Sequence, residues 1–141
     1  MRIMAIDYGD AHTGIAISDQ TGLLAGHTTT IHSRKQEAVA EGIGQLIAEY
    51  GVTELVLGYP KNMDGTLGPR AEKAAAFAKV LEEAFHLPVV LWDERRTTID
   101  AHNILASAGK NAKKRKQTVD AVAAALILEG YLTFRRNQAQ T

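Results

Sequence analysis

The stretch Ile3-Met4-Ala5-Ile6-Asp7-Tyr8-Gly9-Asp10-Ala11-His12-Thr13-Gly14-Ile15-Ala16-Ile17-Ser18-Asp19 contains two short apolar runs separated by a turn with glycine at both ends. This pattern predicts two adjacent strands joined by a tight connection. Because side chains alternate along a strand, Ile3, Ala5 and Asp7 are expected on one face of the first strand, and the intervening residues on the other. Asp7 therefore places a carboxylate at the end of an otherwise apolar face.

A carboxylate at that position needs a partner. An ionised group in an apolar face costs several kcal/mol unless it is hydrogen-bonded, paired or bound to a cation. In one interpretation, Asp7 accepts hydrogen bonds from the turn that follows it. In the other, Asp7 belongs to a group of acidic residues that performs chemistry. The second interpretation requires further carboxylates at the same end of the sheet.

Length and composition fit one ordinary globular domain over residues 1–141, with residues 135–141 expected to form a frayed polar tail. Every apolar run is shorter than a membrane-spanning helix requires and the N-terminus resembles no signal peptide, so we expect a cytoplasmic protein without membrane contact. Without cysteines, a metal would need oxygen ligands or the five histidines. The net charge of zero argues against non-specific coating of nucleic acid but allows a local basic patch.

The remaining sequence alternates between strand and helix patterns. Ser33 and Gly51 are the expected start and stop signals of the first helix. The expected strands cover residues 26–31, 53–59 and 89–92, and the expected helices cover 33–50, 69–85, 97–108 and 118–132. The apolar stripes of two helices consist of Phe77, Val80, Leu81, Ala84 and Phe85, and of Val119, Val122, Ala123, Leu126 and Ile127.

These elements predict an α/β fold. Short connections imply that the first three strands form an antiparallel meander, whereas helical crossovers make the last two strands parallel. The expected architecture is therefore a mixed sheet flanked by helices.

Further acidic residues lie where they would reach the same edge of this sheet. In open sheets, sites gather outside the carboxyl ends of the parallel strands. Asp93 and Glu94 follow the last strand, and because consecutive residues point to opposite faces, at most one of them shares the face of Asp7. Asp120 lies in the first turn of the last helix, where it either points back toward the strand ends or complements the helix dipole for about 0.3–1 kcal/mol.

Carboxylates gathered at one point repel one another unless cations neutralise them. Hard oxygen ligands suit Mg²⁺ or Mn²⁺. Two such ions activate a water and stabilise the leaving oxygen of a phosphodiester. If the carboxylates meet, the sequence favours metal-dependent phosphodiester hydrolysis.

Basic residues offer contacts for such a substrate. Lys61, Asn62 and Arg70 border the expected cleft at the strand ends. The run from Lys110 to Lys116 is expected to be a loop, because it is too charged for regular packed structure. Such a loop is either solvated surface or a clamp that releases counterions from phosphates, and beside a metal cluster we favour the clamp. Its residues are Lys113, Lys114, Arg115 and Lys116.

Several motifs together resemble one protein family. They are Ile6-Asp7-Tyr8-Gly9, Gly58-Tyr59-Pro60-Lys61-Asn62-Met63-Asp64-Gly65, Asp93-Glu94-Arg95 with Thr97-Thr98, and Val119-Asp120-Ala121 running into Ile127-Leu128-Glu129-Gly130-Tyr131-Leu132. In this order, and over essentially the whole chain, they are similar to the YqgF/RuvX family. Its members are assigned as nucleases of pre-16S ribosomal RNA and were once proposed as Holliday-junction resolvases.

The resemblance implies an RNase H-like fold and carries the family's acidic, metal-binding site onto Asp7, Glu94 and Asp120. It is also the reason for preferring Glu94 over Asp93. Arg95, in the same motif, joins the expected nucleic-acid contacts. One turn departs from the family: where relatives commonly read Gly-Thr-Lys-Arg, this chain has Gly9-Asp10-Ala11-His12. The resemblance therefore carries no substrate contact onto that turn.

The leading hypothesis is a metal-dependent endonuclease of structured RNA that uses two Mg²⁺ or Mn²⁺ ions and processes the 5′ end of pre-16S ribosomal RNA. Its expected partners are a ribosomal precursor, in preference to a DNA junction, and ribosomal particles, and it would act as a monomer or homodimer. The alternatives are a DNA-junction resolvase and a ribosome-binding factor with a silent acidic site. An actin-like ATPase is a further alternative, because Asp7-x-Gly9 and Thr13-Gly14 resemble its phosphate loop, but such enzymes need two such domains.

Overall fold

The computed structural model describes residues 2–19, 25–60, 64–93 and 112–139, and at residues 25, 112–120 and 139 the backbone alone. At its centre is a five-stranded sheet in the order β3-β2-β1-β4-β5. Neighbouring strands among β1 (Arg2–Asp7), β2 (His12–Ser18) and β3 (Ala25–His32) pair antiparallel. β4 (Val52–Tyr59) and β5 (Val89–Asp93) extend the sheet in parallel from β1. The predicted mixed sheet is confirmed.

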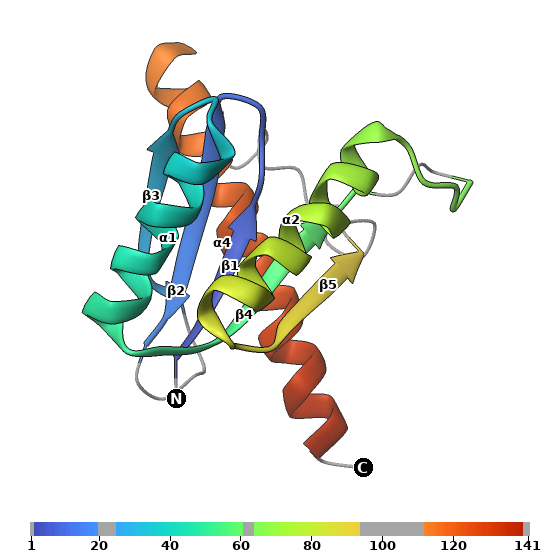
Figure 1. Ribbon diagram of the computed structural model, residues 1–141. Coiled ribbons are helices and arrows are strands. Elements are labelled where there is room, and N and C mark those ends of the chain that lie inside the picture. The colour runs from blue at the N-terminus through green and yellow to red at the C-terminus, as the bar shows by residue number, and fades with distance from the viewer. Residues whose placement is uncertain (1, 20–24, 61–63, 94–111, 140–141) are drawn as a thin grey trace.

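Helices cover both faces of this sheet (Figure 1). α1 (Gln36–Tyr50) and α2 (Pro69–Phe85) lie on one face, and α4 (Ala112–Ala139) lies on the other. α1 ends at Gly51, whose φ of 67° is left-handed, as its glycine predicts. Pro69 begins α2, where a missing N–H removes no helical hydrogen bond. The helix predicted over 97–108 lies outside the described residues.

Strand alternation divides the core into two layers. Met4 and Ile6 are fully buried against α1 and α2, whereas Ile3 and Ala5 are fully buried with residues of α4. The two faces predicted for the first strand are therefore confirmed. Because the central strand is covered on both sides, its apolar run is nearly continuous.

The apolar stripes of α2 and α4 differ from the prediction. Val80 and Ala84 are exposed. The residues that α2 buries are Ala71, Ala74, Phe77, Ala78 and Leu81. On α4, the buried residues are Ala124, Ile127, Leu128, Tyr131 and Leu132, whereas Val122, Ala123 and Leu126 are only partly buried. Both helices bury alanines against the sheet, which lets the helix backbone approach the strands closely. A stripe defined by large apolar residues does not predict which alanines are buried in this way.

Ser33 does not cap α1. The cap residue is Lys35, and no side chain accepts a hydrogen bond from the first turn. Instead, the Ser33 Oγ accepts a hydrogen bond from the Lys35 N–H at 3.1 Å, and the Ser33 N–H donates to the Ala11 carbonyl at 3.0 Å. Ser33 therefore ties the connection between β3 and α1 to the turn between β1 and β2.

α4 is longer at both ends than predicted. It begins at Ala112 and ends at Ala139, so the loop predicted at the basic run is wrong over residues 112–116. Residues 135–139, which were expected to belong to a frayed tail, lie within the last turns of the helix. Lysine and arginine are good helix formers, so a basic composition does not exclude a helix. The C-terminal turns are held by tertiary contacts, including the Phe134 ring, whose centroid lies 5.8 Å from that of Trp92.

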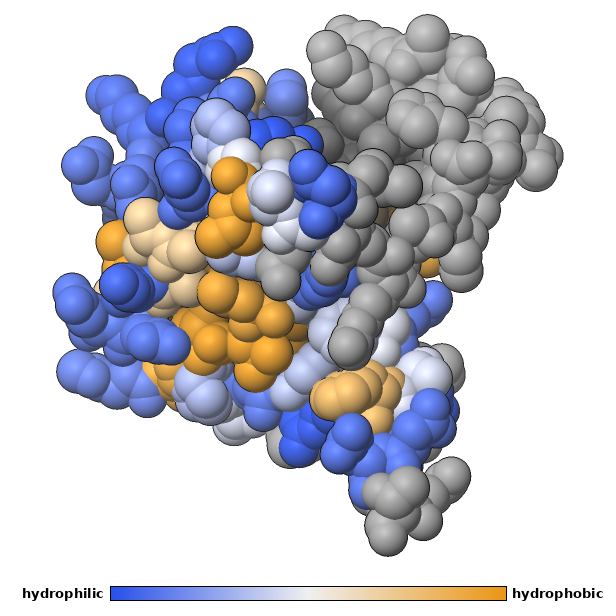
Figure 2. All heavy atoms as spheres, turned by 90° about the vertical axis from the view of Figure 1, so that its right-hand side faces the viewer, coloured by the Kyte–Doolittle hydropathy of each residue, from blue (hydrophilic) through white to orange (hydrophobic). Residues whose placement is uncertain are grey.

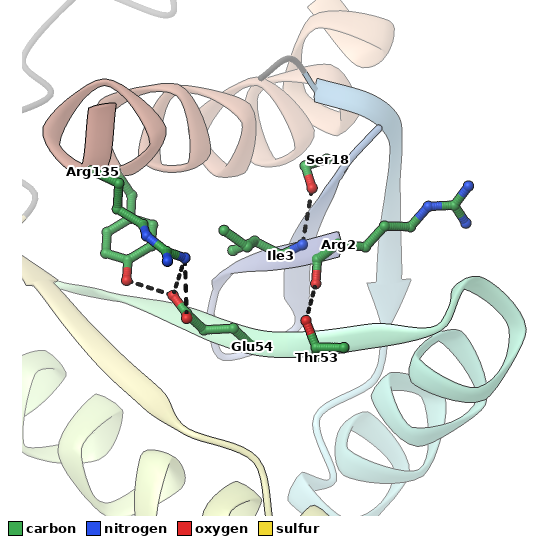
Figure 3. A network of polar contacts seen from close by, with 7 residues as sticks. Arg2, Ile3, Ser18, Thr53, Glu54 and Arg135 are labelled. Carbon is green, nitrogen blue, oxygen red and sulfur yellow. Dashed lines mark hydrogen bonds and ion pairs between the residues drawn. The ribbon is translucent and has the colours of Figure 1, made fainter. Parts of the chain in front are cut away.

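A polar network joins α4 to the amino end of β4 (Figure 3). The Glu54 carboxylate accepts hydrogen bonds from the Tyr131 hydroxyl at 2.5 Å and from the Arg135 guanidinium at 3.2 Å. Next to it in the sheet, the Ile3 N–H donates to Ser18 Oγ at 2.9 Å. These bonds satisfy polar groups within a largely apolar layer.

Figure 2 shows the side of the molecule where β5 forms the edge of the sheet, and an apolar area is visible there. Two exposed large apolar residues belong to elements on this side: Val80 of α2 is 38% exposed and Leu91 of β5 is 41% exposed. None of the described helices is both long enough and apolar enough to cross a membrane.

Candidate active site

Asp7 is the last residue of β1, the central strand of the sheet. Because Ile3 and Ala5 are buried with α4, alternation places Asp7 on the α4 face, where it is only partly buried. Its cross-strand partner on β2 is Gly14, which has no side chain. An acid therefore ends the apolar face of β1, as predicted.

The turn that follows Asp7 requires glycine at position 9. A Cβ atom there would clash with the carbonyl oxygen of His12. Gly9 therefore allows the chain to reverse immediately after Asp7, and the hydrogen bond from Ser33 to Ala11 holds the turn from outside. A carboxylate next to so constrained a turn has a well-defined position, which suits a ligand or a catalytic group.

The carboxyl ends of β1, β4 and β5 lie at one edge of the sheet because these strands are parallel. Asp93 ends β5 at this edge. Its neighbour Trp92 packs with α4, so Asp93 falls on the opposite face of the sheet from Asp7. Asp93 is therefore not on the face of Asp7. Glu94, the other candidate, lies outside the described residues.

α4 runs back along the sheet from this edge. Tyr131 bonds to Glu54 near the amino end of β4. A helix rises about 1.5 Å per residue, so residue 120 lies roughly 16 Å back along α4, about the length of strand from Glu54 to the end of β4. The backbone of Asp120 therefore lies toward the edge at which β1 and β4 end, and Figure 1 shows the first turns of α4 there. The Asp120 side chain lies outside the described part.

Of the predicted nucleic-acid contacts, Arg70 has a described side chain. It is exposed in the first turn of α2, which follows the carboxyl end of β4. Lys61, Asn62 and Arg95 lie outside the described residues. Lys113, Lys114, Arg115 and Lys116 lie on the first turns of α4, with their side chains likewise outside the description.

On the α2 side of the same edge lies a shallow cavity of about 220 Å³. Lys73 of α2 and Asp10 of the turn line it and form an ion pair at 3.3 Å. Tyr8 also lines it, and its ring stacks on Phe77 with centroids 4.1 Å apart. Burial raises the pKa of the Tyr8 hydroxyl, while Lys73 lowers it and Asp10 raises it to smaller extents. The sequence carries no signal for this pairing, because Asp10 and Lys73 lie 63 positions apart.

Asp7 is the member of the predicted acidic triad whose side chain is described. Within the described part of the chain, no three acidic or histidine side chains gather into a metal site. The position of Asp7 nevertheless fits a divalent cation, because it offers hard carboxylate oxygens at a partly exposed strand end beside a glycine.

Comparisons with known proteins match nearly the whole chain. The RuvX family model, described as a Holliday junction resolvase, matches residues 1–134. A "Putative pre-16S rRNA nuclease" of Halothermothrix orenii is 47% identical over 135 residues, which is 96% of this chain and 96% of the relative. A protein of the same description from Thermoanaerobacter pseudethanolicus is 45% identical and covers 98% of this chain and 100% of the relative.

Among solved structures, T. thermophilus RuvC in complex with a Holliday junction substrate aligns over 95% of this chain and 96% of that chain. The TM-score is 0.62 and the sequence identity is 16%, so this likeness bears on the fold, which is RNase H-like. The family match agrees with the motifs around Asp7 and Asp120. The chain therefore belongs to the RuvX family.

Proposed function

We propose that this chain is a metal-dependent endonuclease that cleaves structured RNA, with the 5′ end of pre-16S ribosomal RNA as its substrate. The observation that carries the proposal is the near-full-length identity to relatives named for pre-16S rRNA. The position of Asp7 at the carboxyl end of the central strand supports the same chemistry. Such an activity would place the chain in the cytoplasm, with ribosomal particles as partners.

In this proposal, Asp7, Glu94 and Asp120 hold one or two Mg²⁺ or Mn²⁺ ions. The ions supply an activated water and stabilise the leaving oxygen of the phosphodiester. The contribution of Asp7 is a positioned negative charge, held by the turn at Gly9. The buried apolar residues behind it, Ile3 and Ala5, exclude water from one side and strengthen its electrostatic interactions.

Cations around the same edge would bind the phosphates of the RNA. In the sequence, Lys61, the neutral amide of Asn62 and Arg70 follow the end of β4, and Arg95 follows β5. The basic run contributes differently as a helix than as a loop. Residues three positions apart are neighbours on a helix, so we expect Lys113 and Lys116 to contact the RNA together if their side of α4 faces it.

A cleavage assay tests this function. A pre-16S RNA fragment and a four-way DNA junction are incubated with the chain at equal phosphate concentration, in Mg²⁺, in Mn²⁺ and in EDTA. We expect both metals to support cleavage of the RNA and EDTA to abolish it. Cleavage of the junction alone would contradict the RNA assignment and support the resolvase alternative, which the RuvC-like fold favours. If the chain binds the RNA but cleaves it in neither metal, the enzymatic function is wrong and the chain is a binding factor.

A further inference from the structure

Two histidines form a direct contact at the edge of the sheet where β1 ends. His12 of β2 and His32 of β3 occupy opposed positions in the antiparallel ladder. Their Nδ1 atoms lie 2.8 Å apart, and the two rings meet edge to face with centroids 4.9 Å apart. This separation is a hydrogen-bond distance, so one ring donates its Nδ1–H and the other accepts.

The contact determines where the remaining protons lie. In the neutral pair, the donor ring carries its proton on Nδ1, which leaves its Nε2 as an acceptor, and the acceptor ring carries its proton on Nε2. One added proton binds to the free Nε2 of the donor ring. The pair then carries one positive charge, keeps the bond between the Nδ1 atoms, and has two Nε2–H donors. A second proton would break that bond and place two charges side by side.

The histidine pair lies near Asp7. Ala16 of β2 is buried with α4, so alternation places His12 on the α4 face, which is also the face of Asp7. Asp7 pairs with Gly14, so His12 lies two residues, or roughly 7 Å, further along β2. His12 is partly exposed and His32 is exposed. A polynucleotide with one phosphate at Asp7 would therefore have a neighbouring phosphate within reach of the pair.

Other charged residues belong to the elements next to the pair. The turn that precedes His12 carries Asp10, which forms an ion pair with Lys73. The connection that follows His32 carries Arg34 and Lys35, both exposed. The strand β1 contributes Asp7. The helix α4 packs across β2 and β3, and the backbone of its first turns carries Lys113, Lys114, Arg115, Lys116 and Asp120, whose side chains lie outside the described part.

We propose that His12 and His32 form a phosphate-binding pair, activated by a single proton, that contacts the nucleic-acid backbone next to the phosphate at Asp7. The inference rests on the proposed function for the identity of the polyanion. The two Nε2–H groups of the protonated pair donate charge-assisted hydrogen bonds to phosphate oxygens. The neutral pair has one such donor and no charge, so binding through this contact strengthens as the pH falls.

The first test measures binding of a fluorescent RNA hairpin in EDTA, where metal-dependent cleavage does not interfere. The affinity is compared at about pH 5.5 and about pH 8, which bracket histidine titration. We expect the wild type to bind roughly 3- to 10-fold more tightly at the lower pH. His12→Gln and His32→Gln should each remove most of this gain, and the double variant should remove little more, because the residues act as a unit.

His27→Gln is the matched control, because His27 also lies on β3 but its ring stacks on Tyr50, 4.9 Å away between centroids. It should keep the full pH dependence. At the lower pH, the pair variants should also reduce the magnitude of the salt slope by up to ~0.7 for single strands or ~0.9 for duplex. If His12→Gln and His32→Gln bind with the wild-type pH dependence, the proposal is wrong.

Imidazole ¹⁵N spectra of the wild type provide a second test that needs no variant. At high pH, one of the two rings should show a proton on Nδ1 and the other a proton on Nε2, and inorganic phosphate at low pH should shift both Nε2 signals. If both rings carry their proton on Nε2 alone, the two Nδ1 atoms share no hydrogen bond and the proposal is wrong. The two proposals can fail separately. If RNA binds in a pH-dependent way through the pair but is not cleaved, the nuclease function is wrong. If RNA is cleaved but the histidine variants do not change binding, the phosphate-binding role of the pair is wrong.

Discussion

Glu54 and Asp7 are acidic residues on the same face of two neighbouring inner strands, but they lie at opposite ends of these strands. Glu54 lies near the amino end of β4, and its carboxylate accepts hydrogen bonds from Tyr131 and Arg135 of α4. Asp7 lies at the carboxyl end of β1, opposite Gly14 and just before a turn that excludes any side chain at position 9.

The difference shows how position decides what a partly buried acid does. Glu54 is surrounded by donors from a helix that packs over it, so its charge stabilises the attachment of α4. Asp7 lies where the parallel strands end, opposite a glycine, and in the proposed function its charge binds a cation. In the sequence, both residues are simply acids within apolar runs. Variants of the two residues test this contrast.

Asp7→Asn should have the largest effect on activity. Loss of a metal ligand removes several kcal/mol of transition-state stabilisation, so RNA cleavage should fall at least about 100-fold. RNA binding should be retained or become tighter, because phosphate repulsion falls. Thermal melts without metal should show unchanged or higher stability, since crowded carboxylates oppose folding.

Glu54→Gln is the control for this variant, because it removes the same charge from the same face and should leave cleavage intact. If Asp7 only caps its turn, Asp7→Asn should instead lose about 1 kcal/mol of stability and still cleave RNA. Wild-type cleavage by Asp7→Asn in both magnesium and manganese would end the nuclease assignment at this residue.

Glu54→Ala should mainly reduce stability. The substitution leaves the Tyr131 hydroxyl and the Arg135 guanidinium without the carboxylate that they contact. We expect the free energy of unfolding to fall by about 2 kcal/mol in urea titrations, with the cleavage rate of the folded protein unchanged. A variant as stable as the wild type would show that the network in Figure 3 contributes nothing.

Tyr131 should make stability fall at alkaline pH. Burial first, and then the hydrogen bond and the charge of Glu54, raise its pKa from the usual 10.0 to about 12, while Arg135 opposes them. The folded state therefore holds this proton more tightly than the unfolded state. The resulting stabilisation is fully present below pH 10.0 and is lost as the pH rises toward about 12.

Urea titrations at a series of alkaline pH values measure this effect. Tyr131→Phe should make the decline in unfolding free energy shallower between pH 10.0 and about 12. The pKa of Tyr8 is also raised, so Tyr8→Phe measures the remaining part of the decline. An unchanged pH slope in Tyr131→Phe would contradict the assignment.

Removing charge from the basic run should have the smallest effect on RNA binding. Because the run lies on a helix, the size of this effect should depend on which residues are replaced. Replacing Lys113 and Lys116 by glutamine removes charge from one side of α4, whereas replacing Lys114 and Arg115 removes it from elsewhere on the helix. One pair should reduce the magnitude of the salt slope of RNA binding more than the other, by up to ~0.7 per lost contact with single strands. Equal effects would favour a flexible clamp, and the absence of any effect would identify solvated surface.

The strand faces and the end of α1 were predictable because they depend on local rules. Alternation places Ile3 and Asp7 on one face whatever packs against it, and Gly51 ends α1 through its own backbone preference. The stripe of α2 was not predictable in detail, because a close approach to the sheet buries Ala71 and leaves Val80 exposed.

The candidate site was predictable only in part. In the sequence, alternation allows at most one of Asp93 and Glu94 on the face of Asp7, and the choice of Glu94 comes from the family resemblance. Asp120 is a candidate from its place in the first turn of the last helix, and the resemblance adds it to the acidic site. The pairs Asp10–Lys73 and His12–His32 join residues 63 and 20 positions apart. Their contacts depend on strand register and helix placement, which no local pattern in this sequence specifies.

The most direct test of the metal-dependent site is an anomalous difference map from crystals soaked in Mn²⁺. We predict manganese at about 2.1 Å from a carboxylate oxygen of Asp7, with Glu94 and Asp120 as further ligands, and no such peak in Asp7→Asn crystals. A map without manganese at Asp7, obtained from protein that cleaves the RNA in the same manganese concentration, would contradict a catalytic metal site at this residue.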